Sequence, residues 1–139
     1  MKKRLYDGKA TVKDRILERI KRSRYSVFIP TDFEDITSYP QLLRALKLLT
    51  KEQKIVRFGY GAYAKAEVNP LNNKVYPVRD MLSILQELFK KLKIKWDYSE
   101  SLQAYNEGKT TQIPVKKLLV IKDRFARKLN GAQELYAKQ

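Results

Sequence analysis

Apolar residues recur every three or four positions in the first helix that the sequence predicts. After Thr11, a suitable N-cap, Val12, Ile16 and Ile20 fall on one face of a helix of about twelve residues, opposite a basic face. Residues 25–29 are mostly β-branched or aromatic, which predicts a short strand. The proline that follows stops this strand because it has no backbone N–H for a sheet hydrogen bond.

A very short second helix is predicted directly after that proline. Residues 31–34 have the form of a capping box, in which the Thr31 hydroxyl and the Glu34 carboxylate accept hydrogen bonds from reciprocal backbone N–H groups. We expect this helix to hold the apolar residues Phe33 and Ile36.

A third helix is predicted from the N-cap Ser38 to about Glu52, because Pro40 is tolerated in a first helical turn. Its leucines recur at helical spacing, which predicts one buried face and one polar face. The buried face is expected to comprise Leu42, Leu46 and Leu49, with Leu43 or Ala45 beside them.

Two short strands, residues 54–58 and 62–66, flank the sequence Gly59-Tyr60-Gly61 and predict a β-hairpin. The two glycines permit the positive φ that such a turn needs. Helix, strand, short helix, helix and hairpin in this order predict a winged helix-turn-helix over residues 1–69, with the hairpin as its wing.

The second half of the chain, residues 70–139, is predicted to be a small helix-plus-antiparallel-sheet unit, so that the fold class is α+β. The boundary is placed at residues 70–77, which are rich in proline and asparagine. The predicted helices of this half cover residues 80–92 and 99–107, and Gly108 caps the second of them. Strands are predicted over residues 94–98 and 115–121. Two further strands, at 127–129 and 134–136, flank the turn Asn130-Gly131 and would complete a β-meander.

The net charge indicates a polyanionic partner, since the 139 residues carry 30 Lys and Arg against 15 Asp and Glu, or +15. Residues 1–29 hold ten basic and three acidic side chains, residues 30–70 six and five, and residues 71–139 fourteen and seven. Basic segments therefore flank residues 30–70, which hold the predicted recognition helix and wing, and this pattern suits phosphate contacts beside a more neutral recognition element.

Composition also excludes several chemistries. The chain has no cysteine and no histidine, which removes disulfides, thiolate catalysis, the commonest general base and the commonest metal ligands. We therefore expect no catalytic residue, no metal and no cofactor. No apolar run approaches the roughly 18 residues of a membrane span, and no hydrophobic segment follows the basic start, so a cytoplasmic location without membrane contact is expected.

The predicted function is sequence-directed binding of double-stranded DNA in transcription regulation. A recognition helix enters the major groove with its first turns on base edges, where arginine pairs with guanine and glutamine with adenine. The predicted DNA-binding residues are Tyr39, Gln41, Arg44 and Lys47 for the bases, Lys47 and Lys51 for phosphates, and Arg57 and Tyr60 on the wing, whereas Tyr63 is expected to pack inward.

A family resemblance points the same way. The succession Leu46, Leu49, Lys54-Ile55, Arg57, Gly59, Gly61 and Tyr63 resembles the N-terminal winged helix of the AbiEi-like antitoxins of type IV toxin–antitoxin systems. Residues 104–114, a helix end at a glycine followed by Thr-Thr-Gln-Ile-Pro, are similar to a later segment of that family. The resemblance covers roughly residues 11–138 and implies a short member that represses its own operon, counters a nucleotidyltransferase-like toxin, and uses its second half for homodimer or toxin contacts.

Two other classes of function remain open on the sequence alone. Asp97, Glu107 and Lys109 match the D…ExK pattern of metal-dependent nucleases, although Glu107 is predicted at a helix end where that fold has a strand. A basic surface with nine tyrosines also suits an RNA-binding module, or a protein-binding module with an acidic partner.

Overall fold

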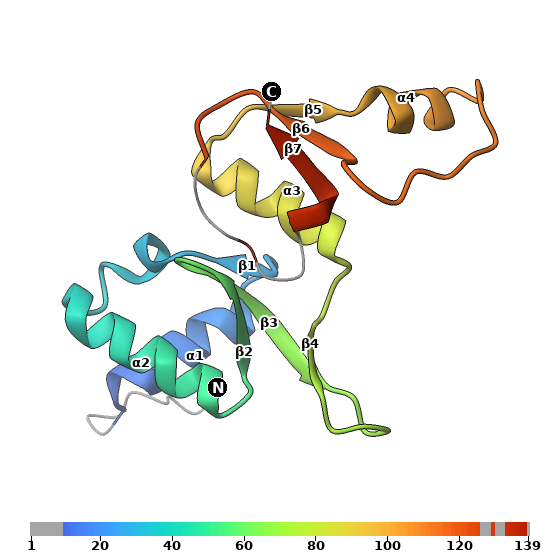
Figure 1. Cartoon of the computed structure of the whole chain (residues 1–139). Coiled ribbons are helices and arrows are strands. Elements are labelled where there is room, and N and C mark those ends of the chain that lie inside the picture. The colour runs from blue at the N-terminus through green and yellow to red at the C-terminus, as the bar shows by residue number, and fades with distance from the viewer. Residues whose placement is uncertain (1–9, 126–128, 130–132, 139) are drawn as a thin grey trace.

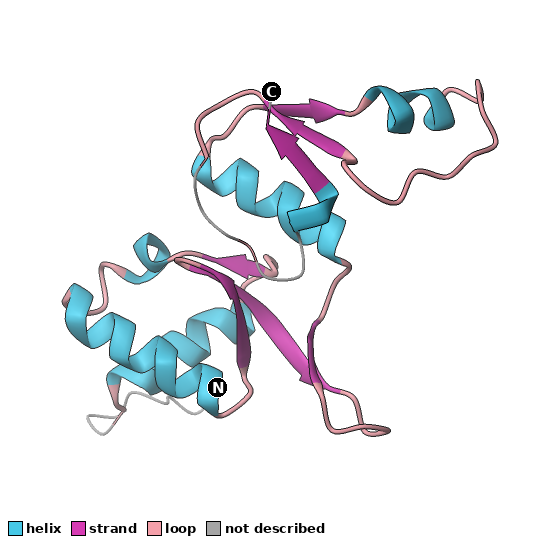
Figure 2. Ribbon diagram, in the orientation of Figure 1, coloured by secondary structure: helices cyan, strands magenta, loops and turns pink. Residues whose placement is uncertain are grey.

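The computed structural model describes residues 10–125, 129 and 133–138, and it confirms a mixed α+β fold with two sheets (Figures 1 and 2). The helices are α1 (Val12–Arg22), α2 (Tyr39–Lys51), α3 (Met81–Leu92) and α4 (Glu100–Asn106), with the 3-10 helices η1 (Pro30–Phe33) and η2 (Gln133–Leu135). The strands are β1 (Val27–Phe28), β2 (Ile55–Gly59), β3 (Ala62–Val68), β4 (Val75–Pro77), β5 (Trp96–Tyr98), β6 (Leu119–Ile121) and β7 (Tyr136–Lys138). Among the described residues, no helix has the length and apolar character that crossing a bilayer requires.

Helices α1 and α2 begin where their caps predict. The Thr11 hydroxyl accepts a hydrogen bond from the Asp14 N–H, and the Asp14 carboxylate accepts one from the Thr11 N–H, both at 3.1 Å. Ser38 is the N-cap of α2 and Pro40 lies in its first turn, which is consistent with the fixed φ of proline and its missing N–H.

Strand β3 is the centre of the first sheet, with β1 and β2 antiparallel to it on opposite edges. Strand β3 pairs on one edge with β1 before Lys65 and with β4 after it. The two partners meet at Lys65, whose N–H donates to the Ser26 carbonyl and whose carbonyl accepts from the Val78 N–H. Residues 70–77, predicted as a boundary loop, therefore contain a strand of the first sheet. Whether residues 1–69 and 70–139 fold independently stays a prediction.

Two local predictions in the first half are wrong. The Thr31 capping box does not form, because the helical turn begins at Pro30 and its N-cap is Ile29, two residues before the predicted N-cap. The Asp32 carboxylate instead accepts from the Ile29 N–H at 2.9 Å. In the hairpin only Gly61 has a positive φ, at 63°, while Gly59 is the last residue of β2 beside a β-bulge.

The second sheet is mixed, so the prediction of an antiparallel sheet ending in a β-meander is wrong. Strand β6 pairs antiparallel with β5 but parallel with β7. Residues 122–135 connect β6 to β7, which is long enough to return the chain in the same direction, and residues 133–135 form η2 where a strand was expected. The predicted Asn130-Gly131 turn lies outside the described residues.

The first sheet lies between two hydrophobic clusters, with α1 and α2 on one face and α3 on the other (Figure 1). Side chains alternate along β3, since Ala62 and Ala64 join the α3 cluster and Tyr63 joins the α1–α2 cluster. The α3 cluster also takes in Leu119 and Ile121 of the second sheet, so that both halves of the chain share one core.

Polar contacts also hold α3 against the first half of the chain. The Glu87 carboxylate accepts hydrogen bonds from the backbone N–H groups of Ser26 at 2.7 Å and Val27 at 2.6 Å. The Lys91 ammonium lies 2.7 Å from the Asp32 carboxylate and over the Phe28 ring. Because Lys91 is engaged in this way, it positions α3 rather than offering a charge to a ligand.

The N-cap of α3 gives a pH-dependent prediction. Hydrogen bonds from the Ser83 backbone N–H and hydroxyl hold the pKa of Asp80 below its usual value of 3.8, so the folded state favours the ionised carboxylate. Its stabilisation is present above the unfolded pKa and is lost as the pH falls through the lower folded pKa. We expect Asp80→Ala to lower the free energy of unfolding by about 1 kcal/mol at pH 7, and by less below roughly pH 3.5.

Urea unfolding at the two pH values measures this difference, with Asp80→Asn as the control that keeps the cap but does not titrate. The same loss for Asp80→Ala at both pH values would show that ionisation of Asp80 contributes nothing.

Candidate nucleic-acid interface

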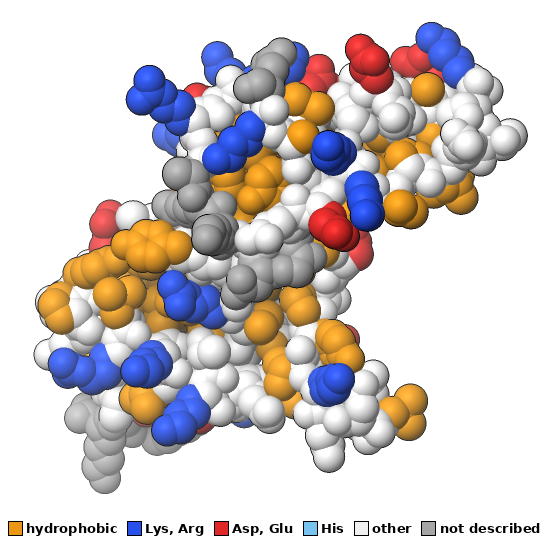
Figure 3. Space-filling view, viewed as in Figure 1, with side chains coloured by type: hydrophobic (Ala, Val, Ile, Leu, Met, Phe, Trp, Pro, Cys, Tyr) orange, Lys and Arg blue, Asp and Glu red, His pale blue; other side chains and the backbone are white. Residues whose placement is uncertain are grey.

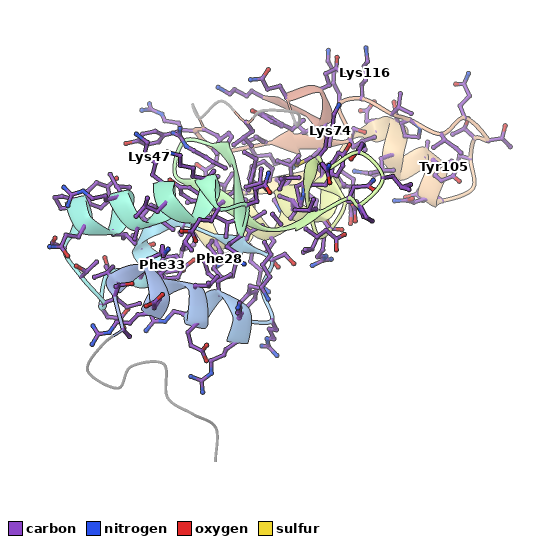
Figure 4. The ribbon with its side chains drawn as sticks, turned by 90° about the horizontal axis from the view of Figure 1, so that it is seen from below. Phe28, Phe33, Lys47, Lys74, Tyr105 and Lys116 are labelled. Carbon is purple, nitrogen blue, oxygen red and sulfur yellow. The ribbon has the colours of Figure 1, made fainter. Side chains whose placement is uncertain are left out.

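The exposed face of α2 carries the cations that the sequence predicts to contact DNA. Its buried face consists of Leu42, Ala45, Leu46 and Leu49, as predicted. At 3.6 residues per turn, the exposed residues Pro40, Arg44, Lys47 and Lys51 fall within roughly 60° of one another on the opposite side. Figure 4 shows Phe28 and Phe33 between α1 and α2, and Lys47 on the side of α2 away from them.

A groove of about 640 Å³ lies between α2 and the β2–β3 hairpin, and we call it the α2–hairpin groove. It brings five of the seven predicted DNA-binding residues together, from two segments that the sequence separates. The groove is lined by Pro30, Tyr39, Leu43, Lys47, Thr50, Lys51, Arg57, Tyr60, Gly61 and Tyr63.

The other two predicted residues, Gln41 and Arg44, lie on the side of α2 that faces α1. They line a separate hollow of about 340 Å³ together with Thr11, Lys13 and Leu48. Arg44 therefore stands on the outer ridge of α2, exposed but outside the groove. The predicted site consists of two adjoining surfaces on either side of this ridge.

The α2–hairpin groove has three basic side chains and no acidic side chain in its lining. No acidic side chain lines it, and Lys47, Lys51 and Arg57 have no ion-pair partner within the described part of the chain. Figure 3 shows Lys and Arg side chains over α2 at lower left, beside a hydrophobic patch. Charges of one sign that lack internal partners are available for an anionic ligand.

Another basic hollow, formed by Arg15, Arg19 and Arg22 of α1, is partly neutralised by contrast. Both terminal nitrogens of Arg19 donate to Asp35, at 2.6 and 2.9 Å, and this contact holds the pKa of Asp35 below its usual value. Arg22 lies 3.6 Å from Glu18. This surface of α1 thus offers less uncompensated charge than the groove.

Sequence reasoning missed five residues of the groove, namely Pro30, Leu43, Thr50, Gly61 and Tyr63. Residues 39, 43, 47 and 51 follow a four-residue spacing, so Leu43 belongs to the same stripe as Tyr39 and Lys47, and this signal was available from the sequence. That Pro30 and Tyr63 reach the groove depends on how the sheet packs against α2, which no local pattern specifies.

Tyr63 is both a core residue and a groove residue. It is only 7% exposed and joins the α1–α2 cluster, which confirms the prediction that it packs inward. Burial raises the pKa of its hydroxyl, although the charge of Arg57 opposes the change. No described residue bonds this hydroxyl, and no fully buried side-chain oxygen among the described residues lacks a partner, so the hydroxyl of this groove-lining residue is not fully buried.

The nuclease-like residues are separated in the structure. Asp97 lies in β5 and pairs with Lys122 at 3.5 Å, while Glu107 follows α4 and pairs with Lys109 at 3.0 Å. The seven-residue helix between the two carboxylates spans about 10 Å. No group of three or more acidic side chains in the described ranges is placed to hold a metal ion.

Comparison of the sequence with models of known protein families gives no match, and comparisons with curated proteins and with solved structures give none either.

Proposed function

We propose that this protein binds double-stranded DNA, with α2 as recognition helix and the β2–β3 hairpin as the wing of a winged helix-turn-helix. The observation that carries the proposal is the α2–hairpin groove, which Lys47, Lys51 and Arg57 line from two elements and which no acidic side chain lines. A duplex presents a dense row of phosphates, and cations without internal partners gain most from it.

The arrangement of elements also supports the proposal. Helix α1, strand β1, the turn η1, helix α2 and the β2–β3 hairpin follow one another, and β3 pairs with both β1 and β2. Helix α2 packs Leu42, Leu46 and Leu49 inward and turns a ridge with Arg44, Lys47 and Lys51 outward, which is the form a helix needs to enter a major groove about 12 Å wide. The hairpin then lies beside the same helix, where a wing contacts the neighbouring backbone.

Contacts on the two sides of the α2 ridge have different roles in this proposal. Arg44 and Gln41 contact base edges, since a guanidinium pairs bidentately with guanine and an amide with adenine. Lys47 and Lys51 contact mainly phosphates, and Arg57 contacts the adjoining backbone or minor groove from the wing. Tyr39 and Tyr60 supply the aromatic contacts.

Arg44 gives the test of sequence-directed binding. A preferred duplex is first selected from a random library, and its affinity is compared with that of a scrambled duplex at one salt concentration. We expect Arg44→Ala to cost about 1–3 kcal/mol on the selected duplex and much less on the scrambled one. Arg124→Ala, which removes an exposed arginine of the second half, is the control.

Two results bear against the proposal. If Arg44→Ala weakens both duplexes equally, Arg44 contacts the backbone and sequence is not read there. Failure of the wild-type protein to bind any duplex at low salt would refute DNA binding altogether.

The biological role we propose follows the resemblance to the AbiEi-like antitoxins. The protein represses its own operon, counters a nucleotidyltransferase-like toxin encoded beside it, and uses the second half of the chain for homodimer or toxin contacts, without catalysis of its own. The test is expression of the neighbouring gene with and without this one: growth arrest by the neighbour, relieved by this protein, is expected. A harmless neighbour would remove the antitoxin role and leave DNA binding untouched.

A further inference from the structure

We propose that the α2–hairpin groove holds an unpaired base, so that duplex DNA with a single-stranded extension binds more tightly than a blunt duplex. This inference rests on the proposed function and adds a second ligand element to the same site.

Phosphate binding does not explain why apolar residues line the groove. Tyr39 is 55% exposed and Leu43 37% exposed, although both lie among lysines on a basic surface. With Pro30 and the Tyr63 ring they form apolar walls that gain nothing from a phosphate. A base has an aromatic face for which stacking on a tyrosine is favourable whatever the sequence.

Because the groove is positively charged, it favours an aromatic ligand that also carries negative charge. Lys47, Lys51 and Arg57 line the groove together with its apolar walls, and no acidic side chain is present to repel an anion. An unpaired nucleotide combines an aromatic ring with a phosphate on either side, so it matches both parts of the groove. A neutral aromatic ligand would leave the cations without a partner, and a bare phosphate would leave the walls without one.

The hydroxyl of Tyr63, a residue that lines the groove, supplies a directional contact in this proposal. Burial raises its pKa, so it stays protonated at neutral pH and donates a hydrogen bond. The oxygens and ring nitrogens of bases are acceptors for such a donor. A polar atom among apolar lining residues fixes the orientation of a ligand, as in many small-molecule sites.

Whether the bound base is paired or unpaired depends on which bases can enter the groove. The groove, at about 640 Å³, falls within the range of roughly 300–1,000 Å³ for ligand pockets and has room for a base. A base inside a duplex cannot reach it without leaving the stack, which costs a few kcal/mol. A base in a single-stranded extension has no partner to leave, and for that reason we expect extensions to bind best.

The experiment compares three labelled duplexes that share one paired sequence. One is blunt, one carries a four-nucleotide thymidine extension, and one carries an extension of four abasic sites, which adds the same phosphates but no bases. We expect the thymidine extension to bind about tenfold more tightly than the abasic extension, in line with stacking of one base on an aromatic ring.

Variants separate stacking from charge and from folding. We expect Tyr39→Ala to bring the ratio between the two extensions close to one and Tyr39→Phe to preserve it, because phenylalanine keeps the ring. Lys47→Ala is expected to weaken both extensions alike. Tyr39 is an exposed residue of the first turn of α2, so thermal unfolding of both Tyr39 variants should match that of the wild type.

Equal affinity for the thymidine and abasic extensions, with blunt duplex still bound, overturns this inference and leaves the proposed function standing. Binding of the thymidine extension without binding of blunt duplex sustains the unpaired-base site and refutes the duplex proposal. A preference that survives in Tyr39→Ala also overturns the inference, since the base would then be held elsewhere.

Discussion

Replacing Lys47, Lys51 and Arg57 together by alanine is expected to weaken binding of duplex DNA by roughly 10²–10³-fold at 0.1 M salt. Each phosphate that a cation neutralises releases counterions and contributes about 0.9 to the slope of log K against log salt concentration. Loss of three such contacts should therefore flatten the slope by about 2.7. Fluorescence anisotropy titrations from 0.05 to about 0.3 M salt measure both quantities.

The matched control removes the same amount of charge from the second half of the chain. Lys109, Lys116 and Lys122 each have an acidic neighbour, at 3.0, 3.8 and 3.5 Å, so their charge is already compensated. Their triple alanine variant is expected to change the slope by less than about one. If both triple variants change the slope equally, DNA is bound by overall charge and the α2–hairpin groove has no special role.

The elements of the first half could be predicted because their signals are local. The spacing of Leu42, Leu46 and Leu49 specifies one buried helix face, and the caps Thr11 and Ser38 specify where helices begin. The start of the short helix after β1 was harder to predict, since the helical turn begins at Pro30 and not after a Thr31 cap. Proline at this position is compatible both with the end of a strand and with the first turn of a helix, and only the surrounding backbone selects between these two roles.

The second half was harder to predict because its pairings are not local. The sequence around β7 does not record that the strand runs parallel to β6, since direction depends on the path of residues 122–135. Strand β4 is short and sits in a segment rich in turn residues, so its pairing with β3 left little pattern. The groove likewise depends on a non-local arrangement, because Pro30 of η1 and Tyr63 of β3 line it together with residues of α2.

The shared cluster on α3 bears on how the two halves work together. Glu87 accepts hydrogen bonds from Val27 of β1 and from the preceding Ser26, and β1 pairs with the same strand, β3, that forms half of the hairpin. A partner that binds the second half and shifts α3 would thus act on the first sheet through a few direct contacts. This gives the C-terminal half a physical route to the α2–hairpin groove.

Phe89 is one of the largest fully buried side chains among the described residues, and its removal is expected to cost much stability. Its ring is 0% exposed and packs edge-on against Phe125 at 5.3 Å and Tyr136 at 6.1 Å, in the cluster that also contains Val27 and Ala64 of the first sheet. Phe89→Ala should lower the free energy of unfolding by about 3–5 kcal/mol through lost burial and the cavity that remains. Ile113→Ala, at a residue 67% exposed, is the control and should cost under about 0.5 kcal/mol.

Urea unfolding followed by two probes shows whether this loss reaches both halves of the chain. Trp96, the single tryptophan, reports on the second sheet, while far-UV circular dichroism reports largely on the helices, including α1 and α2. Because the α3 cluster includes residues of both sheets, we expect the two transitions to coincide in the wild type and to shift together in Phe89→Ala. A Trp96 transition that shifts alone would show that residues 1–69 fold independently of residues 70–139.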